Sequence, residues 1–192
     1  MMQRGHLFPL IAFMAIYTLE QSPVAHFFFQ STKSAPFWLI VRLYVGYEWI
    51  MGSMEKLANP AWFGTGAGSA LQGFLQGAFA KAGGAHPDVQ TWYVSFLQGF
   101  VMPHLTLFSN MVAVGELLVG IALVLGVVTG VAAFFGAFMN LNFLLAGTVS
   151  VNPQLIVLEF LLVFAWRVAG YWGGDRYALP FLHRICPFGG WR

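Results

Sequence analysis

Four long apolar segments constrain the fold of this chain more than any other feature. They cover residues 35–53, 105–126, 128–148 and 153–172, and each is long enough to cross the roughly 30 Å hydrocarbon core of a bilayer as a helix. The chain is 58% apolar and only 8% charged, far from the balance of a soluble domain. We therefore expect an all-α integral membrane protein, with a four-transmembrane-helix bundle at 35–182 surrounded by the lipid bilayer.

The few basic residues indicate how the bundle is oriented. Lys33 precedes the first span, and Arg176, Arg184 and Arg192 follow the last. The long connection 57–104 carries only Lys81 in its interior. By the positive-inside rule, the tail 183–192 lies in the cytoplasm and the 57–104 segment lies outside.

Two stretches of the outer segment have the periodicity of amphipathic helices. Apolar residues recur at spacings of three and four over 71–79 and again over 89–101. The polar face of the second stretch has no Lys or Arg, unlike a helix that lies on anionic lipid. We expect the pair to cap the outer mouth of the bundle; a pair of interfacial helices without a lid role is the alternative.

The N-terminal segment 1–34 is a separate hydrophobic region. Residues 7–19 follow Arg4 like a signal-peptide core, but no small-residue cleavage site comes after them. Thirteen residues are too few to span a bilayer, so we expect an interfacial or partner-packed helix. A crossing helix extended to Phe29 is the alternative.

Five ionisable side chains lie within the predicted spans: Arg42, Glu48, Glu116, Glu159 and Arg167. Each costs about 2.5–3.5 kcal/mol at mid-bilayer, so they require partners or a wet cavity. The carboxylates lie at middle and outer depths and are candidates for a substrate or quinone site. The two arginines lie in the inner half and are structural ion-pair candidates. A pair between Glu116 and Arg42 is the structural alternative for that carboxylate.

Asn140 and Asn142 share the third span but point to nearly opposite sides, because residues two apart on a helix differ by about 200°. Asn140 continues a stripe with Ala132 and Gly136, so its amide should bond a neighbouring backbone or Glu116. Asn142 then faces elsewhere and is a candidate ligand contact. Both asparagines are also candidates for quinone binding. For both, an ordinary interhelical hydrogen bond is the alternative.

Helical spacing also separates Glu159 from Arg167. Arg167 is rotated by about 80° from the face that Glu159 shares with Trp166. Arg167 is therefore expected to reach another helix or the inner headgroups.

Several chemistries are disfavoured by composition and spacing. A single cysteine, Cys186, leaves no disulfide, paired-thiol or zinc cluster within the chain. The five histidines lie in loops or at span ends, which does not suit paired haem ligands, and no flavin or phosphate-binding motif is present. The net charge of +2 without a basic run does not suggest nucleic acid.

Three stretches resemble the DoxX and DoxD family of small bacterial and archaeal membrane proteins. They are FWLIVRLYVGYEWIMGSMEKLANPAWFG (37–64), VGELLVGIALVLGVVTGVAAFFGAFMNLNFLLAGTVSVNP (114–153) and AWRVAGYWGGDRYALP (165–180). The resemblance covers roughly residues 22–182. It implies four transmembrane helices in a prokaryotic cytoplasmic membrane and, by analogy with the best-described relatives, a subunit of thiosulfate:quinone oxidoreductase.

Three functions follow as hypotheses. The first is a membrane subunit of a quinone-linked oxidoreductase, with quinone as its cofactor or substrate and other subunits, or further copies of the chain, as partners. The second is a non-catalytic accessory subunit of a larger respiratory or photosynthetic complex. The third is a small-solute transporter, although the chain shows no internal repeat.

Overall fold

Helices make up all the regular secondary structure between residues 22 and 185, the part of the chain that the computed structural model describes. They are α1 (Pro23–Gln30), η2 (Thr32–Ser34), α2 (Ala35–Ala58), α3 (Ser69–Ala80), α4 (Thr91–Phe96), η3 (Leu97–Val101), η4 (Met102–His104), α5 (Leu105–Leu125), α6 (Thr129–Leu145), α7 (Asn152–Phe164), α8 (Trp166–Ala169) and α9 (Asp175–Ile185). The prediction of an all-α protein is confirmed. Most of the predicted N-terminal segment and the end of the predicted tail lie outside the described residues.

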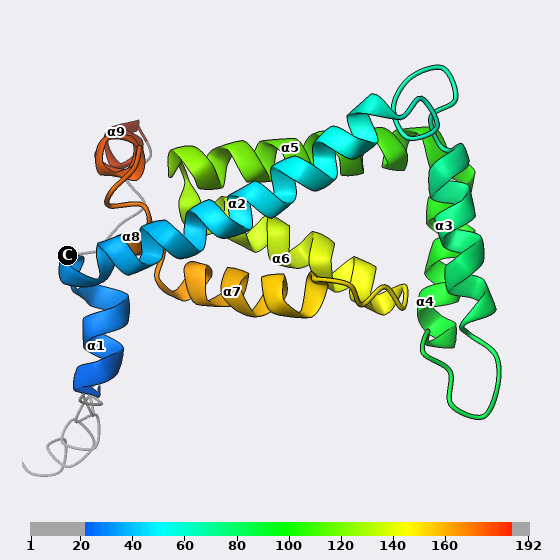
Figure 1. Ribbon diagram of the computed structural model, residues 1–192, viewed down its shortest axis with the longest axis horizontal. Coiled ribbons are helices and arrows are strands. Elements are labelled where there is room, and N and C mark those ends of the chain that lie inside the picture. Colours follow the sequence, from blue (N-terminus) through cyan, green and yellow to red (C-terminus); the bar gives the residue numbers. More distant parts are fainter. Residues whose placement is uncertain (1–21, 186–192) are drawn as a thin grey trace, which may run out of the picture.

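Helices α2, α5, α6 and α7 run lengthwise side by side and form the body of the molecule (Figure 1). Helix α2 packs against α5, and α6 packs against both α5 and α7. Glycines allow the closest approach: a Cβ at Gly46 would lie 3.0 Å from the carbonyl oxygen of Gly120, and one at Gly120 would lie 2.9 Å from the Ile50 nitrogen. This contact aligns α2 and α5 in depth.

Helices α3 and α4 stand across one end of the body (Figure 1). Their apolar faces pack together with the start of α5 and the end of α6. The predicted amphipathic helices are therefore present, over 69–80 and 91–101. The second is continuous with the next long helix, because a π-helical stretch, η3, and a short 3-10 turn, η4, lead directly into α5.

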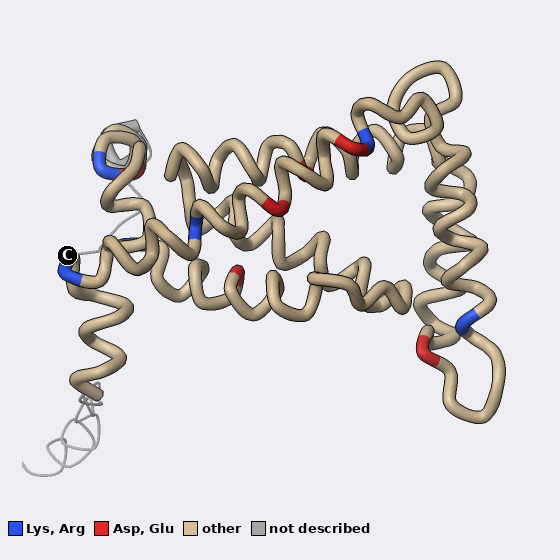
Figure 2. The backbone as a smooth tube through the Cα atoms, in the orientation of Figure 1, with Lys and Arg blue, Asp and Glu red and all other residues tan. Residues whose placement is uncertain are grey.

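The observed helices differ in length from the predicted spans. The run Thr91–Leu125 is long and apolar enough to cross a membrane, while Thr129–Leu145 and Asn152–Phe164 are apolar but shorter. The predicted fourth span, 153–172, is broken at Ala165 between α7 and α8. Helix α7 begins with Asn152 as its first residue, and Val151 is its N-cap. Charged side chains are sparse along the whole body (Figure 2).

At the end of the body opposite the α3–α4 pair, Arg42 and Asp175 hydrogen-bond to the ends of helices. The Arg42 guanidinium is buried and donates to the carbonyl oxygens of Leu123 and Val124 at the end of α5, and to that of Trp172. The predicted pair between Arg42 and Glu116 is therefore wrong. Arg42 instead satisfies carbonyls that the last turn of a helix leaves without partners.

Asp175 acts at the same end as an acceptor, whereas Arg42 acts as a donor. Its carboxylate accepts from the backbone N–H groups of Val128 and Thr129, where α6 begins. A carboxylate here both fills free N–H groups and complements the positive end of the helix. Val128 has a φ of +46°, and Asp175 stabilises this tight turn between α5 and α6.

Candidate functional site

A buried polar cluster joins three helices of the body. Oε1 of Glu159 on α7 accepts from Nε1 of Trp49 on α2 at 2.6 Å, and Oε2 accepts from Nδ2 of Asn140 on α6 at 2.7 Å. Glu159 and Asn140 are fully buried, and Trp49 is 4% exposed. Both donors are neutral, so the cluster holds a carboxyl group by hydrogen bonds instead of an ion pair.

Gly136 makes room for this cluster. A Cβ at this position would lie 2.5 Å from Oε1 of Glu159 and 3.1 Å from Nε1 of Trp49. Asn140 follows Gly136 by four residues on the same face of α6, as the small-residue stripe predicted. The stripe meets a neighbouring helix as expected, but the partner of Asn140 is Glu159 and not Glu116.

One oxygen of the cluster remains without a donor. Oδ1 of Asn140 is buried and makes no hydrogen bond with another described residue. A buried amide carbonyl without a donor costs about 1–3 kcal/mol. Asn140 can therefore still accept a hydrogen bond from a hydroxyl or water that reaches the cluster.

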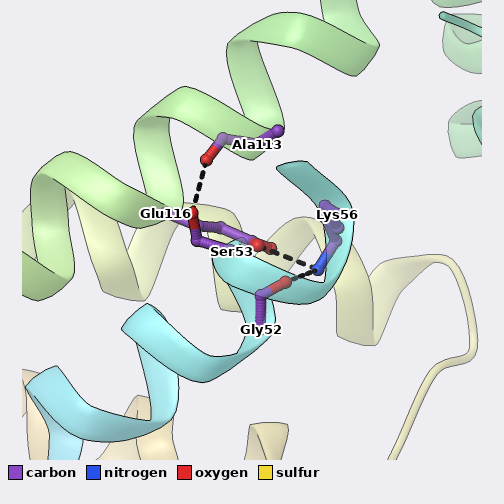
Figure 3. Close-up of polar contacts among 5 residues, drawn as sticks. All are labelled: Gly52, Ser53, Lys56, Ala113 and Glu116. Carbon is purple, nitrogen blue, oxygen red and sulfur yellow. Dashed lines mark hydrogen bonds and ion pairs between the residues drawn. The ribbon is translucent and has the colours of Figure 1, made fainter. Parts of the chain in front are cut away.

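Glu116 on α5 forms a second buried site with Lys56 on α2 (Figure 3). Its Oε2 lies 2.8 Å from Nζ of Lys56, and Glu116 is 2% exposed. Lys56 also donates to the carbonyl oxygen of Gly52, while Ser53 donates to that of Ala113. Lys56, in the last turn of α2, is thus the partner of Glu116.

Asn142 faces the α3–α4 pair. The Tyr93 hydroxyl on α4 lies 3.0 Å from the Asn142 carbonyl oxygen and 3.1 Å from its Oδ1. Nearby, Lys81 donates to the carbonyl oxygen of Gly147. Asn142 and Asn140 do point to different surroundings, as helical spacing predicted. Tyr93 was missed as a polar contact because it falls within the regular apolar stripe of 89–101.

Two candidate residues lie apart from these sites. Glu48 is half-buried on α2 and forms no hydrogen bond or ion pair with another described residue. Arg167 places its guanidinium 5.1 Å from the centre of the Trp166 ring. The structure therefore brings Asn140 and Glu159 together and separates them from Glu48, Glu116 and Asn142.

Two apolar cavities open elsewhere on the body. One of about 400 Å³ lies between α1, α2 and α7 and is lined mainly by Phe28, Phe29, Phe37, Trp38 and Leu161. Another of about 240 Å³ lies beside Thr129 and Trp166. Within residues 22–185, no three His, Cys, Asp or Glu side chains gather as a metal ion would require.

Comparison with protein-family models, with curated proteins and with solved structures found no significant match for this chain. The resemblance to the DoxX and DoxD family therefore stays a prediction made from the residues.

Proposed function

We propose that this protein is a DoxX-like, four-span membrane subunit of a quinone-linked oxidoreductase. In this proposal, Glu159, Asn140 and Trp49 form the polar end of the quinone site. The free Oδ1 of Asn140, beside a buried carboxyl that only neutral groups contact, is the observation that carries it.

The membrane placement is supported by the surface and the lengths of the helices. At 1.5 Å per residue, α2 and α5 are roughly 36 Å and 32 Å long, and α6 is roughly 26 Å long. Large apolar side chains are exposed along all four long helices, whereas Arg42, Glu116 and Glu159 are buried among them. This is the reverse of a soluble helical protein, whose charged side chains face water.

The chemistry of a quinol matches the groups in the cluster. Oxidation of a quinol to a quinone releases two electrons and two protons, and the reverse reaction takes them up. A quinol hydroxyl can donate to Oδ1 of Asn140, the Glu159 carboxylate can take or return one of the two protons, and the other proton is exchanged with water. The electrons pass to or from another subunit; in a thiosulfate-linked enzyme, that subunit would oxidise thiosulfate. Because the cluster is fully covered, the ring reaches it only when neighbouring side chains move.

The test begins with the intact assembly from the native membrane. It is extracted in mild detergent, separated on a blue-native gel, and analysed by mass spectrometry for its proteins and bound quinone. Stoichiometric quinone and co-migrating redox subunits support the proposal. Glu159→Gln is expected to lower quinone turnover by about a hundredfold or more, the usual contribution of a proton-transferring group.

A matched control comes from the second buried carboxyl. Glu116→Gln also neutralises a buried glutamate, but its partner is Lys56 and it lies outside the proposed site. Assembly that survives in both variants, with turnover lost only in Glu159→Gln, separates a quinone role from a folding role. Full turnover in Glu159→Gln and in Asn140→Leu would reject the site.

An accessory subunit without catalysis is the second candidate. It is favoured by the hydrogen bonds that occupy both oxygens of Glu159, because these bonds hold α2, α6 and α7 together whether or not a ligand binds. A complex that loses this chain but keeps its full turnover and quinone content would establish the accessory role.

A further inference from the structure

The side of α2 that faces away from the bundle carries an exposed stripe with polar groups at its centre. Residues 40, 44, 47, 51 and 54 follow spacings of four and three, and each is between 41% and 69% exposed. They are Ile40, Tyr44, Tyr47, Met51 and Met54. This spacing is that of a helix seam in a coiled coil, and here no described helix packs against it.

The polar groups of the stripe lie half-way along the helix. Tyr47 is next to Glu48, and Tyr44 lies one turn before Glu48, near the middle of Ala35–Ala58. Tyrosine is usually found at the two membrane surfaces, and an unpaired carboxylate facing lipid is unfavourable at the midplane. This inference rests on the proposed membrane placement. In that placement, contact between lipid tails and this side of α2 is unfavourable.

Helix α5 provides the contrast. Its exposed stripe has the same spacings and is wholly apolar: Leu107, Met111, Val114, Leu118, Ile121 and Leu125. Lipid tails suit such a surface. The contacts between Gly46 and Gly120 and between Ser53 and Ala113 place Leu118 level with Glu48. The two helices thus differ in polarity at the same depth.

We propose that this face of α2 binds a transmembrane helix of another protein that carries a Lys or Arg near its midpoint, paired with Glu48. The exposed side chains of Tyr44 and Tyr47 add hydroxyl groups to the same part of α2. The apolar members of the stripe pack against the partner helix on either side.

A second copy of this chain fits the face less well. Copies inserted in the same direction meet about an axis along the membrane normal, so each Glu48 would lie level with the other. Two carboxylates at equal depth repel each other, and the cations of α2 are already engaged inside the bundle: Arg42 with α5 carbonyls and Lys56 with Glu116. A second copy would therefore add a second carboxylate without supplying a cation to neutralise Glu48.

Site-specific photocrosslinking in native membranes tests this interface. A p-benzoylphenylalanine probe is placed at Met51 or, as the control at a lipid-facing position, at Leu118, both in the full chain. We expect a discrete adduct from position 51 with one membrane protein, and none from position 118. Mass spectrometry of the adduct should locate a spanning segment with Lys or Arg near its middle.

The charge of Glu48 provides the second readout. Glu48→Gln is expected to lower the adduct yield about tenfold, the effect of losing 1–2 kcal/mol of interhelical interaction. Glu48→Lys should abolish the adduct, and changing the identified cation of the partner to Glu should restore it. An unchanged elution volume in detergent verifies that the variants fold.

Several outcomes would overturn the interface. An adduct of twice the chain's mass would indicate a second copy, and equal or absent adducts at positions 51 and 118 would show that α2 has no specific partner. A partner segment without a cation, or an adduct yield unaffected by Glu48→Gln, would rule out the proposed charge pair. These results are independent of turnover. An adduct without bound quinone supports the interface and rejects the quinone site, whereas quinone without an adduct does the reverse.

Discussion

Trp49 donates its indole N–H to the Glu159 carboxylate across 2.6 Å, and this contact joins α2 to α7 in the middle of the body. Trp49→Phe removes the donor but keeps an aromatic ring. We expect it to lower the free energy of unfolding by about 1–3 kcal/mol, because a buried oxygen loses its partner. Unfolding in detergent by added denaturant measures this.

The control for this prediction is Trp92→Phe. Trp92 is 61% exposed on α4, so its replacement should change stability by no more than about 0.5 kcal/mol. Equal stability of the Trp49 and Trp92 variants would show that the bond between α2 and α7 contributes nothing.

Gly136 should not tolerate even a methyl group. In Gly136→Ala, the new Cβ would press on Oε1 of Glu159 and on Nε1 of Trp49, so we expect a loss of about 1–3 kcal/mol from overpacking. Gly115→Ala is the matched control, because its Cβ would meet only the flexible Met139 side chain at 3.4 Å. The prediction is wrong if the two variants unfold at the same temperature.

Removing only one partner of the ion pair between Lys56 and Glu116 should lower stability more than replacing both partners. Lys56→Met leaves Glu116 buried without a cation, which is expected to cost about 3–5 kcal/mol. Adding Glu116→Gln removes the unpaired charge and should restore much of the stability. Thermal unfolding of both variants measures the difference; a double variant no more stable than Lys56→Met would contradict this account.

The lengths of apolar runs predicted the long helices well, because a run of apolar residues can be recognised without knowing what packs against it. The beginning of the first span, at residue 35, is also the beginning of α2. Its end was placed too early, at residue 53. The residues Glu55, Lys56 and Leu57 favour helix, so α2 continues to Ala58, and the extra turn brings Lys56 to Glu116.

Partners within the body could not be predicted in the same way. Spacing along α6 indicated that Asn140 meets a neighbouring helix, but both α5 and α7 pack against α6. Which of them presents a carboxylate to Asn140 depends on how each helix is rotated about its axis. The periodicity of a single helix does not reveal that rotation. We therefore expected a backbone group or Glu116 as the partner of Asn140, whereas the partner is Glu159.

Asp175 should hold the beginning of α6 from a distance of 46 residues in the chain. Asp175→Ala leaves the N–H groups of Val128 and Thr129 without their acceptor, and the loss of such a cap costs about 0.5–2 kcal/mol. Hydrogen exchange should accelerate at the first turn of α6 and remain unchanged in α3, at the other end of the molecule. Tyr177→Ser is the control, because Tyr177 lies on the same helix and is 76% exposed. Faster exchange in both variants would mean that α9 as a whole, and not the Asp175 carboxylate, holds this turn.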